Sequence, residues 1–177
     1  MTGRTRKKTR PPLDRESLEQ LALFYVGRYA TTRAKLRAYL GRKVRERGWA
    51  GDREPDIAML AQKFTELGYI DDAAFANARA ASLGRRGYGV RRVEQALYAA
   101  GIEEADGMAA RAHASDTAWD SALAFARKRR FGPFAPAPME PDRKRKAIAA
   151  MIRAGHSYEL ARKFIDAQPG IVPERED

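Results

Sequence analysis

The sequence has no cysteine among its 177 residues and only two histidines. Disulfide bonds, thiol catalysis and cysteine-ligated metal sites are therefore excluded. His113 and His156 stand far apart, and neither is part of a His-x-x-x-His or Glu-x-x-His spacing that would indicate a metal site. A single histidine is far more often a surface or core residue than a ligand. We therefore expect no metal, no cofactor and no catalytic residue.

Long hydrophobic runs are also absent. The longest run of large apolar residues, Leu21 to Val26, is far too short to cross a bilayer. Residues 1–12 are rich in basic side chains, but the apolar core of a signal peptide does not follow them. These features predict a cytoplasmic protein with no membrane partner. They also predict a disordered basic arm over residues 1–13 and an acidic tail over residues 169–177.

Acidic residues are outnumbered by basic ones. The sequence holds 23 aspartates and glutamates against 34 lysines and arginines, which gives a formal net charge of +11 at pH 7. Such an excess predicts an anionic partner, either a nucleic acid or an acidic protein groove. The alternative is that the charge serves solubility alone.

Alternating patterns typical of strands are missing, and nearly every patterned segment has the helical period. The first apolar stripe, for example, consists of Leu18, Leu21, Ala22, Tyr25 and Tyr29. Stripes of this kind recur between capping residues and glycine stops. We expect an all-α protein of three tandem three-helix repeats, stacked into an elongated array that can curve. The repeats span residues 14–70, 71–115 and 116–168, and a proline-rich loop at 132–141 interrupts the third.

Local signals predict how several helices begin. Thr31 or Thr32 can cap the second helix, and Asp72 can cap the fourth. The acidic pairs Asp71-Asp72 and Glu103-Glu104 both follow a glycine stop and open a helix. We therefore interpret these pairs as caps and first-turn acids, and not as catalytic carboxylates.

The middle helices of the three repeats share an apolar pair and a basic start. The apolar pairs can be overlaid as Leu36 with Leu40, Val93 with Leu97, and Ile148 with Met151 or Ile152. Basic residues at a helix start are unexpected, because the positive end of a helix favours acids. Cations there add to the field of the helix end and its free N–H groups, which predicts three anion-binding spots along one side of the array. The alternative is a solvated basic surface that binds nothing.

The glycines between the fourth and fifth helices do not form a phosphate loop. No Lys-Ser or Lys-Thr pair follows Gly84, Gly87 and Gly89, and no strand precedes them. We interpret Tyr88, between two of these glycines, as a packing anchor at the turn more than as a base-stacking platform. The sequence therefore does not indicate an enzyme.

The segment from Gly68 to Ile102 resembles a known signature. Its motifs are Gly68-Tyr69-Ile70-Asp71-Asp72 with Phe75-Ala76, Arg85-Arg86-Gly87-Tyr88-Gly89, Val93, Leu97 and Gly101-Ile102. In residue type and spacing they are similar to the central motif of the RecX family, bacterial regulators of the RecA recombinase. The resemblance is close in the second repeat and extends over residues 18–168 through the helix pattern.

This resemblance implies three-helix repeats that lie in the helical groove of the RecA–DNA filament. It implies modulation, usually inhibition, of the recombinase, ATPase and coprotease activities of RecA, with no catalytic site in the regulator itself. The partners would be the RecA filament and DNA, contacted directly or within the filament, and we expect a monomer. The alternative is a helical nucleic-acid-binding protein that acts without RecA, since short helices with basic first turns also suit a duplex.

The candidates for filament or DNA contact are the basic residues around the starts of the middle helices, together with Tyr88. They are Arg33, Lys35 and Arg37 in the first repeat; Arg85, Arg86, Tyr88, Arg91 and Arg92 in the second; and Arg127, Lys128, Arg129, Arg130, Arg143, Lys144, Arg145 and Lys146 in the third. We expect the four arginines of the second repeat to form the main contact.

Overall fold

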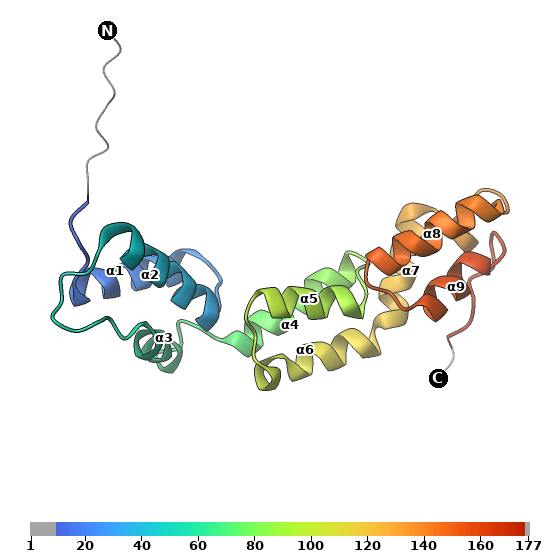
Figure 1. Ribbon diagram of the computed structural model, residues 1–177. Coiled ribbons are helices and arrows are strands. Elements are labelled where there is room, and N and C mark those ends of the chain that lie inside the picture. The colour runs from blue at the N-terminus through green and yellow to red at the C-terminus, as the bar shows by residue number, and fades with distance from the viewer. Residues whose placement is uncertain (1–9, 176–177) are drawn as a thin grey trace, which may run out of the picture. The chain divides into compact units, whose positions relative to one another are not determined.

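The computed structural model describes residues 10–175 of the chain. Over that range the chain forms nine α-helices, one short 3-10 turn and no strand, so the predicted all-α fold is confirmed (Figure 1). The chain divides after Asp72 into two compact units. Among the described residues, no helix is both long enough and apolar enough to span a membrane.

The first unit contains the helices α1 (Arg15–Arg28), α2 (Arg33–Arg47) and α3 (Ile57–Glu66). A capping box between Asp14 and Ser17 starts α1, since each side chain bonds the other residue's backbone N–H. The helices α1 and α3 both pack on α2. Their shared core consists of Leu13, Leu18, Ala22, Leu36, Leu40, Ala61, Phe64 and Ile70.

Leu13 corrects the predicted end of the basic arm. Its side chain is fully buried, its N–H donates to the Gly48 carbonyl at 2.9 Å, and its own carbonyl accepts from the Ala50 N–H at 2.8 Å. Leu13 is therefore part of the first unit. Its burial stabilises the fold by roughly 1.5–3 kcal/mol. Residues 10–12 of the predicted arm are exposed, and residues 1–9 lie outside the described residues.

The second unit begins with α4 (Asp72–Arg85), whose first residue is the division point, followed by α5 (Val90–Ala99) and α6 (Glu104–Asp116). Alanines at helical spacing let these helices approach closely. The core of this triplet consists of Ala76, Ala80, Leu83, Val93, Leu97, Ala100, Ile102, Ala110 and Ala114.

The same unit continues with α7 (Ala118–Arg129), the turn η1 (Gly132–Phe134), α8 (Pro141–Arg153) and α9 (Tyr158–Asp166). The segment predicted as a proline-rich loop is well packed, because it contains η1 and buries Ala135 and Met139. The core of this triplet consists of Ala122, Ala126, Ala135, Met139, Ala147, Met151, Ala161, Phe164 and Ile165.

The predicted acidic tail bonds both triplets of the second unit. The Gly170 N–H donates to the Pro133 carbonyl at 2.8 Å, and Arg175 donates to the Asp116 carbonyl at 3.1 Å. Residues 176–177 of this tail lie outside the described residues.

Each middle helix buries a pair of residues four positions apart. The pairs are Leu36 and Leu40, Val93 and Leu97, and Ala147 and Met151. In α8 the predicted Met151 is buried, but its buried partner is Ala147 and not Ile148, which is only partly buried; the alternative Ile152 is exposed. In the corrected register, the residue directly before the first buried position is basic in all three helices, namely Lys35, Arg92 and Lys146.

Candidate functional site

Four predicted contact residues surround the turn between α4 and α5, and we call them the central arginines: Arg85, Arg86, Arg91 and Arg92. The first pair lies at the end of α4 and just beyond it, and the second pair lies in the first turn of α5. All four are exposed. Arg91 and Arg92 face solvent because the opposite face of α5, with Val93 and Leu97, packs into the core.

Tyr88 sits between the two pairs of arginines. Its ring is half-buried against the core of its triplet. The guanidinium carbon of Arg86 is 5.3 Å from the ring centroid, and that of Arg92 is 5.9 Å away. Each contact of this kind stabilises by about 0.5–1 kcal/mol at an exposed site. Tyr88 is thus a packing anchor that also holds one cation from each side of the turn.

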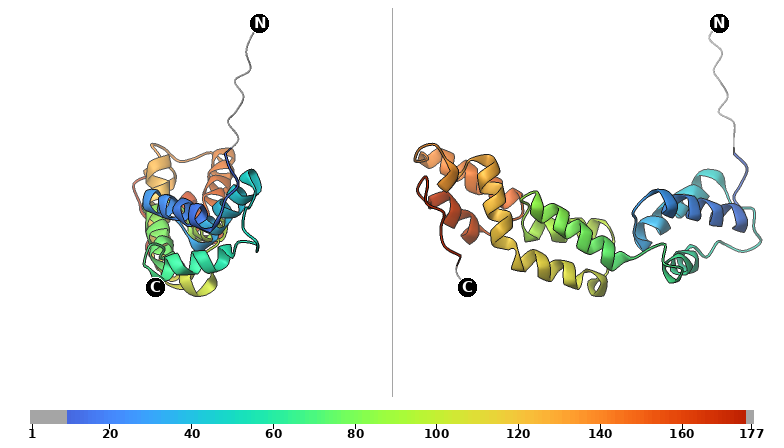
Figure 2. Two further views of the ribbon diagram at one scale, coloured as in Figure 1. Left: turned by 90° about the vertical axis from the view of Figure 1, so that its left-hand side faces the viewer. Right: turned by 180° about the vertical axis from the view of Figure 1, so that it is seen from behind.

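The N-terminus of α5 is not a free anion-binding spot, which corrects the sequence prediction. Its Gly89 N–H donates to the Ala154 carbonyl at 2.9 Å, and its Arg91 N–H donates to the Gly155 carbonyl at 3.1 Å. The C-terminal end of α8 therefore meets the start of α5 (Figures 1 and 2). Opposite helix dipoles face each other there, so any attraction for an external anion comes from the arginine side chains.

The N-terminus of α2 is occupied as well. The Asp72 carboxylate is buried and accepts from the backbone N–H of Arg33 at 3.0 Å and from its Nε at 3.1 Å. Thr32 caps the same turn by accepting from the Lys35 N–H at 3.2 Å. Asp72 was predicted to cap its own helix, but α4 starts at Asp72 itself. The carboxylate instead neutralises Arg33, as a buried charge requires. Arg37, one turn further, is exposed.

Two of the four candidates of α8 form ion pairs. Lys144 pairs with Asp166 of α9 at 3.2 Å, and Arg145 pairs with Asp142 of its own first turn. Arg143 and Lys146 are exposed. The predicted alignment of three such groups along one side of the whole chain stays a prediction.

The end of α7 repeats the geometry of the end of α4. At α4, the Tyr88 N–H donates to the Leu83 carbonyl at 3.0 Å, and Gly87 takes a left-handed conformation with φ +81°. At α7, the Phe131 N–H donates to the Ala126 carbonyl at 2.9 Å. Arg130 takes the place of Gly87 there, with φ +54°.

Nearby rings hold other α7 cations. Arg129 lies over Phe131 at 6.0 Å, and Arg127 lies over Phe134 at 5.2 Å. Lys128 is exposed. In both triplets of the second unit, cations at or next to the end of the first helix therefore lie against aromatic rings.

Arg130→Gly should raise the free energy of unfolding by about 1 kcal/mol, because a left-handed conformation costs a residue with a side chain about that much more than glycine. Thermal melting should show a gain of roughly 2–4 °C. The matched control is Arg129→Gly in the right-handed last turn of α7, which should lower stability by up to about 1 kcal/mol. A lower melting temperature for Arg130→Gly would contradict the assigned strain.

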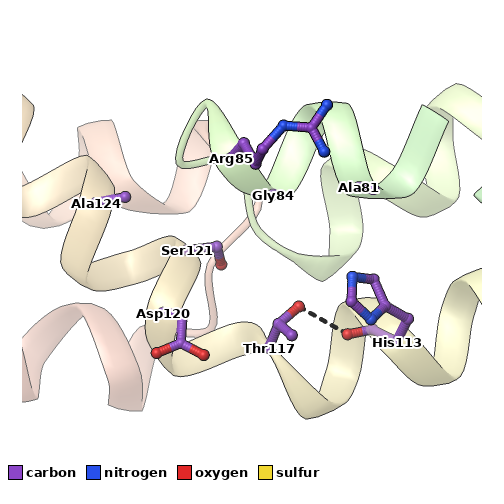
Figure 3. Close-up of a pocket in the computed structure, with 8 residues that line it drawn as sticks. All are labelled: Ala81, Gly84, Arg85, His113, Thr117, Asp120, Ser121 and Ala124. Carbon is purple, nitrogen blue, oxygen red and sulfur yellow. Dashed lines mark hydrogen bonds between the residues drawn. The ribbon is translucent and has the colours of Figure 1, made fainter. Parts of the chain in front are cut away.

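A shallow pocket of about 240 Å³ lies beside Arg85, between α4, α6 and α7 (Figure 3). Arg85 comes from one side of the opening, and His113 and Thr117 come from the other. The Thr117 hydroxyl donates to the His113 carbonyl at 2.7 Å, and the Ser121 hydroxyl donates to the Ala118 carbonyl at 2.9 Å. Because both hydroxyls bond their own helix backbone, this pocket presents no nucleophile paired with a base.

His156 adds a side-chain hydrogen bond where the end of α8 meets the start of α5. Its Nε2 donates to the Gly87 carbonyl at 3.0 Å, and the ring is almost completely buried. Burial lowers the pKa of His156 below its ordinary value of 6.5, although the hydrogen bond to Gly87 acts in the opposite direction. The ring is therefore neutral at pH 7 and serves as a structural donor. Sequence reasoning gave this residue no role, and its only signal was its position directly after the glycine stop of α8.

Known proteins resemble this chain over most of its length. A family model described as the second three-helix domain of RecX matches residues 71–110. The regulatory protein RecX of Myxococcus xanthus is 34% identical over 181 residues, covering 94% of this chain and 96% of that protein. The regulatory protein RecX of Agrobacterium fabrum is 32% identical over 150 residues, covering 81% and 79%.

A solved structure shares the fold. The crystal structure of RecX from Lactobacillus salivarius has a TM-score of 0.65 and 18% identity, covering 85% of this chain and 93% of that one. The RecX family model matches residues of the triplet α4–α6, which carries the central arginines.

Proposed function

Because the chain belongs to the RecX family of regulatory proteins, we propose that it binds the RecA–DNA filament in its helical groove. Binding would modulate, and mainly inhibit, the recombinase, ATPase and coprotease activities of RecA in DNA repair and recombination. The protein would act as a cytoplasmic monomer, without a cofactor and without catalysing a reaction. The sequence resemblance and the regulatory names of both relatives support this proposal.

The observation that carries the proposal is the arrangement of the central arginines. They are exposed on both sides of one turn, and the Tyr88 ring holds two of them. Guanidinium groups match phosphates and carboxylates through paired N–H donors. A filament groove that contains both DNA and protein offers these anions together.

We expect the protein to bind RecA assembled on DNA with a slowly hydrolysed ATP analogue at least about tenfold more tightly than free RecA or bare DNA. With ATP present, the DNA-dependent hydrolysis by RecA should fall as the protein is added. Co-sedimentation and a phosphate-release assay measure the two effects. Equal affinity for bare DNA would favour a nucleic-acid-binding protein that acts without RecA. Unchanged filament stability and ATPase activity at excess protein would contradict the proposal.

A further inference from the structure

Four aromatic side chains of α1, its C-cap and α2 are linked by ring contacts or by a shared cation, and we call them the ring row: Phe24, Tyr25, Tyr29 and Tyr39. Tyr25 stacks on Tyr39 with ring centroids 4.2 Å apart and planes at 13°. Tyr25 also contacts Tyr29, with centroids 5.4 Å apart and planes at 51°. The rings of Tyr39, Tyr25 and Tyr29 are therefore continuous, and the Arg28 guanidinium lies over both Tyr29 and Phe24. The Tyr29 side chain is 50% exposed and that of Phe24 is 60% exposed.

Cations lie against both ends of the ring row. The Arg28 guanidinium carbon is 5.8 Å from the Tyr29 centroid and 6.0 Å from that of Phe24. At the other end, Arg42 and Lys43 lie 5.7 and 5.8 Å from the Tyr39 centroid. The sequence candidates in this unit do not include these three cations.

We propose that the ring row is a binding site for single-stranded nucleic acid. Bases would stack on the exposed rings of Phe24 and Tyr29, and phosphates would contact Arg28, Arg42 and Lys43. Alternating rings and cations suit a single strand, because unpaired bases expose their faces while the backbone carries the charge. A duplex hides its base faces, and an acidic protein segment would use the cations but leave the rings without a partner.

The Glu46 carboxylate competes with a phosphate for Arg42 and Lys43 at one end of the ring row. This carboxylate lies 3.6 Å from the Arg42 Nε and 2.7 Å from the Lys43 Nζ. The hydrogen bond from Lys43 lowers the pKa of the Glu46 carboxyl, so this group is an anion at neutral pH. A phosphate must displace it. Glu46→Gln should therefore tighten binding of a single strand by a few-fold.

The test measures binding of an oligothymidylate of about 20 nucleotides and of an abasic strand with the same number of phosphates, by fluorescence anisotropy. Phe24→Ala with Tyr29→Ala should weaken oligothymidylate binding by roughly tenfold or more and leave abasic-strand binding unchanged, because only stacking is lost. Arg28→Ala should weaken both and reduce the salt slope by about 0.7. Tyr29→Phe keeps the ring and should bind like the wild type.

Two matched variants test whether the effects are specific to the ring row, since they remove a ring and an arginine elsewhere in the first unit. Tyr69 is an exposed ring of the same unit that packs on the buried Phe64, and Tyr69→Ala should leave oligothymidylate binding unchanged. Arg53→Ala removes an exposed arginine from the loop between α2 and α3 and should have less effect than Arg28→Ala. If the double ring variant weakens both strands equally, or weakens neither, the stacking site is ruled out. Tighter binding of a duplex than of the single strand would also overturn it.

This proposal stands apart from the proposed function, because the test uses bare strands and no RecA. The ring row and the central arginines belong to different units. Loss of single-strand binding in the ring variants should leave RecA-filament binding through the central arginines in place, so the two proposals can fail separately.

Discussion

Replacing all four central arginines with alanine should lower the affinity for the RecA–DNA filament by about a hundredfold, since exposed ion pairs contribute up to about 1 kcal/mol each. The fold should survive, because Val93 and Leu97 supply the buried face of α5. Co-sedimentation with nucleotide-held filaments measures the loss. If phosphates are the contact, the slope of log affinity against log salt should flatten by about 0.9 for each lost contact.

A second quadruple variant distinguishes the effect of losing the central arginines from the effect of losing four positive charges anywhere on the protein. It replaces four exposed arginines outside the candidate set: Arg45, Arg53, Arg79 and Arg153. Both variants lose four positive charges, yet only the first should lose most of its filament affinity. Equal losses would mean that general charge attraction drives binding. If the contact is an acidic protein groove and not phosphate, the first variant should lose filament binding but keep its affinity for bare DNA.

The variant without central arginines should melt within a few degrees of the wild type. An isolated helix would gain from losing Arg91 and Arg92, because they lie at its positive end. In the protein, the carbonyls of Ala154 and Gly155, directly after α8, already face that end, so this gain is small. The loss of two contacts with the Tyr88 ring, about 0.5–1 kcal/mol each, acts in the opposite direction. A variant that melts much earlier would mean that these arginines are structural.

Local signals in the sequence predicted much of this fold, because helix caps and glycine stops act over a few residues. Thr32 accepts from the Lys35 N–H as expected of a cap, and Gly68 and Gly101 end their helices with positive φ. The register of α8 was less predictable. Alanine and isoleucine both fit an apolar stripe, and only the packing of neighbouring helices selected Ala147 as the buried residue.

The candidate site was harder to predict from the sequence, because its main contacts join residues that are far apart in the sequence. Nothing local indicates that the carbonyls of Ala154 and Gly155 cap α5, or that Asp72 bonds the first turn of α2. The ring row was missed for a different reason. The sequence places Tyr29 in the apolar stripe of the first helix, yet half of its side chain is exposed where the chain leaves α1.

Gly89→Ala should destabilise the second unit by about 3 kcal/mol or more. Gly89 has φ −82°, which alanine adopts without strain, so the cost is one of space. A Cβ there would lie 2.5 Å from the carbonyl carbon and oxygen of Gly155 and 2.7 Å from the His156 nitrogen. Backbone atoms cannot rotate away, so α5 and α8 must separate. Overpacking costs about 1–3 kcal/mol, and each lost junction hydrogen bond adds about 1 kcal/mol.

The measurement is thermal melting, in which Gly89→Ala should lower the midpoint by about 6–12 °C. Gly84→Ala is the matched control: a Cβ at Gly84, inside α4, would meet nothing within 4 Å. It should therefore raise stability by about 0.5–1 kcal/mol, because alanine favours the helix. If both variants melted alike, the close contact between α5 and α8 would not exist in solution. If only Gly89→Ala melts early and also binds filaments weakly while it is folded, the junction is what positions the central arginines, since neither substitution removes a charge.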